Sequence, residues 1–262
     1  MLKFLLFFLV SLLFACQSSP QNKAKTITIA ASSIPQAELL EQIQEDLKQE
    51  GITLKIKVVD DYNIPNRALA EGEIDANFFQ HKPFLEEQIH QFNYPICCLA
   101  EIHIEPLGIY LGTKNSLKEL PEGSLITLPN DPTNEARALL LLEKAGLITL
   151  EAKNLSNTTV LDIKENSRHF KFKEIDAALL ARTLQETGAS VIPTNYALLA
   201  GLSPIKDAVF IEDKTSPYIN IIAVRCDDLE KNELVLLKKK MQSEKMHSYI
   251  LTKYQGAVIP AF

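Results

Sequence analysis

Residues 75–87, DANFFQHKPFLEE, place three phenylalanines and a histidine within seven positions of one another. They stand where a strand that begins at about residue 74 would end. If residues 74–79 form a strand, Phe79 and His81 continue on one side while Phe78 points to the other side. From residue types alone, two interpretations stay open: rings in the hydrophobic core, which is the more usual arrangement, or rings that line a pocket.

Other residues have the chemistry to bind a small zwitterion such as a free amino acid. Arg137 falls in the second turn of a helix expected to begin near Pro132. A guanidinium binds a carboxylate through two parallel hydrogen bonds, and a nearby helix N-terminus adds partial positive charge. Asn195 and Asn220 offer amide oxygens to an ammonium group. For the arginine a solvated helix face is an open alternative, and for the amides a hydrogen bond to the backbone is the more usual arrangement.

Motifs of common catalytic and cofactor sites are absent from the sequence. It contains no Gly-x-Gly-x-x-Gly, no P-loop and no Gly-x-Ser-x-Gly, and its five histidines form no His-Glu-x-x-His pair. The net charge of −6 comes without a basic patch, which argues against a nucleic-acid partner. We therefore expect a binding protein without catalytic residues, metal or cofactor.

The first residues have the order that is typical of a secretory signal. Lys3 precedes an apolar run over 4–14 that is too short to span a membrane. The run ends in LLFAC, which resembles a bacterial lipobox, in which the cysteine is lipidated and begins the mature chain. We expect residues 1–15 to be the signal peptide and residues 16–25 a flexible tether, held by a lipid on Cys16 to a membrane of the cell envelope and facing the periplasm or cell exterior. An uncleaved anchor and an ordinary signal peptide are the alternatives.

Three cysteines remain after the predicted lipidation residue: Cys97, Cys98 and Cys226. Adjacent cysteines form neither a Cys-x-x-Cys motif nor a metal site, and an odd number leaves at least one of them unpaired. We predict that all three are small, mostly buried apolar side chains.

Short apolar strands alternate with helical patterns along the chain. In the first half, strands are expected at 26–32, at 53–60 and from about 74, and helices at 35–51 and 83–92. In the second half, Asp131 is the predicted N-cap of a long helix and Pro132 its first residue. Repeated strand–helix units predict mostly parallel sheets in an α/β fold.

Two such groups of elements indicate two lobes, between which the chain would cross near 104–113 and 213–225. Ligands of open α/β sheets bind at the carboxyl ends of the strands. In a protein of two lobes, those ends face each other across a cleft.

Several segments of the sequence closely resemble the methionine-binding lipoproteins of the NlpA/MetQ type. They are GEIDANFFQHKPFLEEQ, HIEPLGIY, PNDPTNEARALLLLEKAGLI, TNYALLAGL, SPYINII and YQGAVIPAF, in order from about residue 26 to the C-terminus. The resemblance implies a periplasmic-binding-protein fold, type II-like, with two α/β lobes joined by two crossover segments around a ligand cleft. We predict residues 26–111 and 218–262 as lobe 1 and residues 112–217 as lobe 2.

The family's pocket, carried over by motif, falls on Tyr62, Phe79, His81, Phe84, Arg137, Asn195 and Asn220. Tyr62 lies in DDYNIPN, where the family has a matching tyrosine. Phe84 departs from the pattern, because a tyrosine is common there and its hydroxyl is missing here. Residues 165–189 are only loosely similar to the family.

The resemblance also implies a function: a lipid-anchored receptor that captures methionine and delivers it to the permease and ATPase of an ABC importer. Arg137 would hold the α-carboxylate, the two asparagines would accept from the ammonium, and the aromatic rings would contact the thioether, which packs well on aromatic rings. The alternatives are a receptor for another apolar amino acid or a methionine-containing dipeptide, a surface interaction lipoprotein without a transport role, and an enzyme of the same two-lobe fold.

Overall fold

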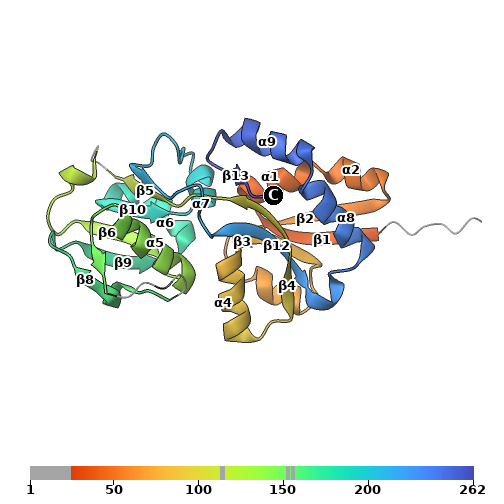
Figure 1. The fold of residues 1–262 in the computed structure, drawn as a ribbon, viewed down its shortest axis with the longest axis horizontal. Coiled ribbons are helices and arrows are strands. Elements are labelled where there is room, and N and C mark those ends of the chain that lie inside the picture. Colours follow the sequence, from red (N-terminus) through yellow and green to blue (C-terminus); the bar gives the residue numbers. More distant parts are fainter. Residues whose placement is uncertain (1–24, 113–115, 152–153, 155–156) are drawn as a thin grey trace, which may run out of the picture.

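Two separate sheets organise the protein (Figure 1). The computed structural model describes residues 25–112, 116–151, 154 and 157–262. The predicted signal peptide, the predicted lipidation residue Cys16 and all but the last residue of the predicted tether lie outside the described residues. Within the described part of the chain, no helix has both the length and the apolar character that crossing a membrane requires.

The first sheet has six strands in the order β13-β4-β12-β3-β1-β2. These strands are β1 (Lys25–Ser32), β2 (Ile52–Val59), β3 (Ala76–His81), β4 (Ile96–Ile104), β12 (Ile219–Arg225) and β13 (Ile259–Pro260). β1 pairs in parallel with β2 and β3, whereas β12 is antiparallel to both β3 and β4. The first lobe is therefore built from the two ends of the chain.

Helices cover both faces of this sheet. They are η1 (Ser33–Ala37), α1 (Glu38–Glu41), α2 (Gln44–Gln49), α3 (Pro65–Ala70), α4 (Lys82–Phe92), η5 (Cys226–Asp228), α8 (Asn232–Met241) and α9 (Glu244–Tyr254). The helices α1, α2, α8 and α9 share one core with Ile27 and Ile29 of β1, while Leu69 of α3 and Leu85 of α4 pack against the opposite face with Ile221. Burial on both faces explains why β12, INIIAVR, is a nearly continuous apolar run in the sequence.

The second sheet has five strands in the order β11-β5-β10-β6-β9. These strands are β5 (Gly108–Leu111), β6 (Leu125–Pro129), β9 (Lys171–Ile175), β10 (Ala189–Ile192) and β11 (Phe210–Ile211), and a separate pair is formed by β7 (Thr149–Leu150) and β8 (Ile163–Glu165). The helices are η2 (Leu117–Glu119), α5 (Pro132–Lys144), η3 (Val160–Asp162), α6 (Ala177–Thr183), η4 (Leu184–Glu186) and α7 (Thr194–Leu199). α5 packs on one face of the sheet, and α6 and α7 pack on the other.

The chain passes between the two sheets twice, and the first crossing is shorter than predicted. β4 ends at Ile104 in the first sheet, and β5 already belongs to the second sheet from Gly108. The predicted lobe boundary after residue 111 is therefore wrong. β5 pairs with β10 through four residues, a long-range pairing that residue types in 104–113 do not reveal. The return crossing runs from β11, which ends at Ile211, to β12, which begins at Ile219.

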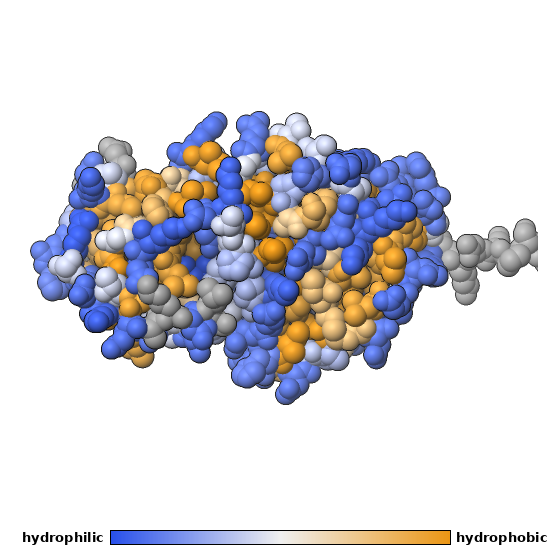
Figure 2. Space-filling view, viewed as in Figure 1, coloured by the Kyte–Doolittle hydropathy of each residue, from blue (hydrophilic) through white to orange (hydrophobic). Residues whose placement is uncertain are grey.

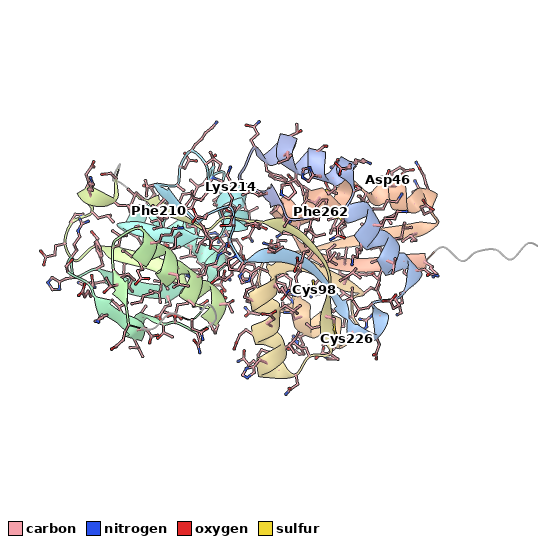
Figure 3. The ribbon with its side chains drawn as sticks, in the orientation of Figure 1. Asp46, Cys98, Phe210, Lys214, Cys226 and Phe262 are labelled. Carbon is pink, nitrogen blue, oxygen red and sulfur yellow. A yellow bond between two sulfur atoms is a disulfide. The ribbon has the colours of Figure 1, made fainter. Side chains whose placement is uncertain are left out.

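The prediction that all three remaining cysteines are merely small, mostly buried apolar side chains is wrong for two of them, whereas at least one is unpaired, as predicted. Cys97 in β4 and Cys226 in η5 form a disulfide, although 129 positions separate them in the sequence. Antiparallel pairing of β4 with β12 sets Val224 opposite Cys97, which brings the residue after β12 within reach. Cys98 is free and partly buried, and burial raises the pKa of its thiol. Figure 3 shows Cys98 and Cys226 in the first lobe.

Candidate functional site

A cavity of about 360 Å³ lies between the two lobes. All seven residues that the sequence predicted for a binding site line it: Tyr62, Phe79, His81, Phe84, Arg137, Asn195 and Asn220. Five more lining residues were missed: Gln80, Glu105, Asn134, Pro193 and Thr194. On the face drawn in Figure 2, atoms of the two lobes meet near the middle of the molecule.

Three aromatic rings form one wall of the cavity. The ring centroids of Tyr62, Phe79 and Phe84 are each 5.9 Å from the other two. Phe79 belongs to β3, where Phe78 points to the opposite face and is fully buried in the core. The strand alternation thus divides the two phenylalanines between core and cavity, as the sequence allowed. Such a triangle of rings suits an apolar or thioether side chain.

His81 lies beside these rings, and both of its ring nitrogens are hydrogen-bonded within the protein. Its Nδ1 accepts from the backbone N–H of Phe84 at 3.1 Å and so caps the N-terminus of α4. In the neutral ring the proton is therefore on Nε2, which donates to Asn134 Oδ1 at 3.1 Å. Burial, followed by the positive charge of Arg137, lowers the pKa of His81 to about 3. His81 is thus a neutral element of the cavity wall.

The N-terminus of α5 reaches the cavity from the second lobe. As predicted, Asp131 is its N-cap, and the carboxylate accepts from the backbone N–H and the side-chain amide of Asn134, both at 3.0 Å. Burial raises the pKa of Asp131, and its hydrogen bonds to the Asn134 backbone and side chain oppose that rise. Because Asn134 also accepts from His81, one chain of hydrogen bonds joins the first turns of α4 and α5 across the lobes.

Arg137 follows one turn later in α5 and is only 4% exposed, so the alternative of a solvated helix face is wrong. Its Nε and Nη2 donate to the two carboxylate oxygens of Glu212 at 3.1 and 2.5 Å, and Nη2 also donates to the backbone oxygen of Glu105 at 2.7 Å. The guanidinium lies 4.4 Å from the ring centre of Tyr218. Burial acts to lower the pKa of Arg137, but the charge of Glu212 outweighs it and the net direction is upward. Among the described residues, none accepts a hydrogen bond from Nη1.

The two asparagines already accept hydrogen bonds from protein donors. Asn195 Oδ1 accepts from the hydroxyl of Tyr62 at 2.8 Å, and Asn220 Oδ1 accepts from Gln36 Nε2 at 3.3 Å. An amide oxygen has two lone pairs, so each retains acceptor capacity. Both amide oxygens therefore accept from side chains, and not from the backbone as the more usual arrangement would have it.

Contacts between the lobes surround the cavity. Besides the bond from Tyr62 to Asn195, the hydroxyl of Tyr196 donates to the backbone oxygen of Asp60 at 3.0 Å, and the Tyr62 and Tyr196 rings are 5.2 Å apart. Burial raises the pKa of Tyr62, so its hydroxyl remains a donor at neutral pH. These contacts hold the lobes in a closed arrangement.

Glu105 is the charged residue that sequence reasoning missed. It is 5% exposed and follows β4 directly, in the first crossing. Its Oε1 accepts a hydrogen bond from Gln36 Nε2 at 2.7 Å. The same oxygen is 2.7 Å from His103 Nε2. The sequence feature that could have revealed Glu105 is an acidic residue directly after an apolar strand, in the segment HIEPLGIY.

The assembled cavity brings together aromatic rings and a buried guanidinium, both of which are recognition groups. The His81 ring connects the aromatic triangle to Tyr218: its centroid is 6.1 Å from that of Phe84 and 5.0 Å from that of Tyr218. The guanidinium of Arg137 lies over the Tyr218 ring. Within the described residues no group of three or more histidine, cysteine or acidic side chains could hold a metal ion. The site thus has an apolar end and a charged end, as an amino acid does.

Comparison with known proteins identifies the family. The sequence model described as NlpA lipoprotein matches residues 27–262. The chain belongs to the NlpA lipoprotein family. The methionine-binding lipoprotein MetQ of Bacillus subtilis, a relative, is 41% identical over 253 residues, which are 94% of this chain and 92% of the relative.

Solved structures agree with the NlpA assignment. A nutrient-binding protein from Burkholderia cenocepacia, bound to methionine, superposes with a TM-score of 0.87 at 42% identity, over 90% of this chain and all of that one. A periplasmic substrate-binding protein of an ABC transporter from Coxiella burnetii gives 0.85 at 40% identity, over 90% of this chain and 100% of that one. The predicted periplasmic-binding-protein fold is confirmed.

Proposed function

We propose that this NlpA-family protein is the receptor that captures methionine for an ABC importer. The observation that carries the proposal is one cavity that joins an aromatic triangle to a buried guanidinium. Tyr62, Phe79 and Phe84 have mutual centroid distances of 5.9 Å, and Arg137 lines the same cavity. Relatives named as methionine-binding and a methionine-bound structural neighbour support the choice of ligand.

In the bound state, Arg137 holds the ligand's α-carboxylate through Nη1, because Nε and Nη2 are committed to Glu212. Asn195 and Asn220 offer their amide oxygens to the α-ammonium. The thioether packs among the three rings, where each sulfur–ring contact contributes about 0.3–1.5 kcal/mol. Phe84 lacks the hydroxyl that is common in the family at this place, so this ring contributes apolar contact alone.

Ligand binding favours the closed arrangement because the cavity walls come from both lobes. The transporter's permease then recognises the closed form, and its ATPase drives release and uptake. A lipid on Cys16 holds the receptor at the membrane of the cell envelope, where the permease resides. The role is one of binding and delivery, without a catalytic step.

The confinement of the cavity favours a single amino acid over a dipeptide. Side chains from both lobes enclose it and leave little free space between them. Among apolar amino acids, the three-ring contact favours the flexible, polarisable methionine side chain over branched ones.

The deciding experiment is isothermal titration of the purified protein, without its signal peptide, with L-methionine, D-methionine, leucine, isoleucine, phenylalanine and a glycyl-methionine dipeptide. Because ligand from the expression host can stay bound, the protein is first unfolded in guanidinium chloride, dialysed and refolded. Mass spectrometry of the released fraction identifies any carried ligand. We expect methionine in that fraction and the tightest binding for methionine. A folded protein that binds none of these compounds contradicts the proposal, as does tighter binding of the dipeptide.

A further inference from the structure

Phe79 is the residue of β3 that strand pairing does not fix. Parallel pairing with β1 ends at Phe78, and in the antiparallel pairing with β12 the partners step from Gln80 directly to Phe78. Phe79 is thus the extra residue of a β-bulge. Bulges next to binding sites re-aim side chains, and here the bulged residue supplies one of the three rings of the cavity. The position of this ring therefore depends on what holds its neighbours.

A cluster of three buried amides, Asn66, Asn77 and Gln80, holds the residue that follows Phe79. Each of the three side chains is at most 3% exposed. Gln80 Nε2 donates to Asn66 Oδ1 at 2.7 Å, and Asn66 Nδ2 donates back to Gln80 Oε1 at 2.8 Å. Gln80 Nε2 also donates to Asn77 Oδ1 at 2.9 Å. Regular alternation would put Gln80 on the side of Phe78, whereas the bulge returns it to the side of Asn77, where these bonds form.

The same amide cluster fixes the start of α3, close to Tyr62. Asn66 is the second residue of α3, and Tyr62 lies four positions before it. Asn77 Nδ2 donates to Asn66 Oδ1 at 2.9 Å and to the backbone oxygen of Pro65 at 3.3 Å. The cluster therefore joins the bulged part of β3 to the segment that carries a second ring of the cavity.

The amide cluster is fully hydrogen-bonded and lies behind the cavity wall. Every nitrogen and oxygen of its three side-chain amides takes part in at least one of these bonds. A buried amide without a partner is costly, whereas a satisfied network is stiff and specifies one arrangement. Gln80 lines the cavity, but Asn66 and Asn77 do not. Any effect of the two asparagines on binding is therefore transmitted by the residues that they hold.

We infer that the amide cluster is a positioning device for the side-chain pocket: it holds the Phe79 and Tyr62 rings at the spacing that selects an unbranched ligand side chain over a branched one. The inference rests on the proposed function and deepens it. Asn66 and Asn77 are its positioning residues. The centroids of the two rings are 5.9 Å apart. An unbranched chain is narrow enough to lie against rings at this spacing, whereas a branched chain needs the rings to move apart, which the cluster makes costly.

The test compares ligands that share the α-carboxylate and the α-ammonium and differ in the side chain: L-methionine, L-norleucine, L-leucine and L-isoleucine. Norleucine is unbranched like methionine and has a methylene in place of the sulfur. After removal of carried ligand, each is titrated calorimetrically against the wild type, Asn66→Ala, Asn77→Ala and Thr127→Val. Thr127→Val is the matched control, because it removes the buried 2.9 Å bond from Thr127 to Ser190 in the second lobe, and neither residue lines the cavity.

For the wild type we expect methionine and norleucine to bind more tightly than leucine and isoleucine. In Asn66→Ala and Asn77→Ala, the ratio of unbranched to branched affinity falls about five- to twentyfold, because the rings can move apart and accept a branched chain. The ratios for methionine and for norleucine fall together. In Thr127→Val the melting temperature falls and both ratios stay at their wild-type values.

Ratios that stay within about twofold of the wild type in every asparagine variant that folds indicate a merely structural role and overturn the inference, however far the melting temperature falls. A fall confined to methionine also overturns it, because the width of the pocket then does not decide. Asn77→Ala keeps the reciprocal Asn66–Gln80 pair, so this milder variant decides the matter if Asn66→Ala does not fold. These outcomes leave the proposed function intact, since the wild type still binds methionine, whereas a folded wild type that binds no methionine overturns both.

Discussion

Arg137 and Glu212 form a buried ion pair with two parallel hydrogen bonds, from Nε to Oε1 at 3.1 Å and from Nη2 to Oε2 at 2.5 Å. The carboxylate comes from the return crossing between the lobes, and the same Nη2 bonds to the backbone oxygen of Glu105 in the first crossing. One side chain therefore contacts both connections between the lobes and lines the ligand cavity. The predicted cation of the site is therefore held in place by residues of both crossings between the lobes.

Replacing Arg137 by alanine removes this cation and leaves Glu212, whose side chain is 14% exposed, without its partner. We expect Arg137→Ala to weaken methionine binding by about 2–5 kcal/mol and to lower the melting temperature of the ligand-free protein. Calorimetry and thermal denaturation measure the two effects. Arg182→Ala, an exposed arginine of α6, is the control and should change neither. Unchanged affinity in Arg137→Ala would refute the role in carboxylate recognition.

Tyr62→Phe keeps an aromatic ring in the triangle and removes the inter-lobe bond to Asn195, which is 2.8 Å long. Closure is then less favourable and the Asn195 oxygen loses its donor. We expect methionine to bind about five- to tenfold more weakly, about 1–1.4 kcal/mol, with the order of preference among amino acids unchanged. The measurement is calorimetry with methionine, leucine and phenylalanine. Tyr94→Phe, a ring that stacks on Phe92 in the same lobe, serves as the control; a shift in side-chain preference would contradict this assignment.

His81 makes stability depend on pH. Its pKa is about 3 in the folded protein, against an ordinary value of 6.5. Between these two values the unfolded chain binds the proton and the folded one does not, so the folded state loses stability as the pH falls from about 6.5 toward 3. The slope from this residue is at most about 1.4 kcal/mol per pH unit.

The variant His81→Asn keeps an acceptor for the N-cap of α4 and has no titrating ring. We expect urea unfolding at several pH values between 4 and 6.5 to give a flatter pH profile for this variant than for the wild type. His90→Asn, at an exposed position of the same helix, should retain the steep profile. Identical slopes for His81→Asn and the wild type would mean that the buried ring does not resist protonation.

The disulfide between Cys97 and Cys226 should contribute to stability without affecting binding. It joins two residues of the first lobe that are 129 positions apart, so the closed loop includes the whole second lobe, and neither cysteine lines the cavity. Replacing both by alanine should lower the free energy of unfolding by about 2–4 kcal/mol and leave methionine affinity within about twofold. Chemical denaturation and calorimetry test this, with Cys98→Ala as the control. A large loss of affinity would show that the link also shapes the site.

Local patterns in the sequence determined much of the binding site. Strand alternation placed Phe78 in the core and Phe79 in the cavity, and the Asp131–Pro132 pair began α5 where predicted. Backbone geometry decides these features within a few residues, so a sequence can reveal them. The family resemblance supplied Tyr62, which no local pattern singles out.

Tertiary structure decided which of these groups are already partnered. Glu212 lies 75 positions from Arg137, and Glu105 receives donors from Gln36 and His103, of which the first is 69 positions away. The Cys97–Cys226 link and the early entry of the chain into the second sheet at Gly108 likewise depend on strand pairing. Such partners meet only when distant strands pair and the two lobes close. Residue types, spacing and the family resemblance together predicted seven of the twelve residues that line the cavity, whereas sheet register and lobe packing determined how its charges are shared.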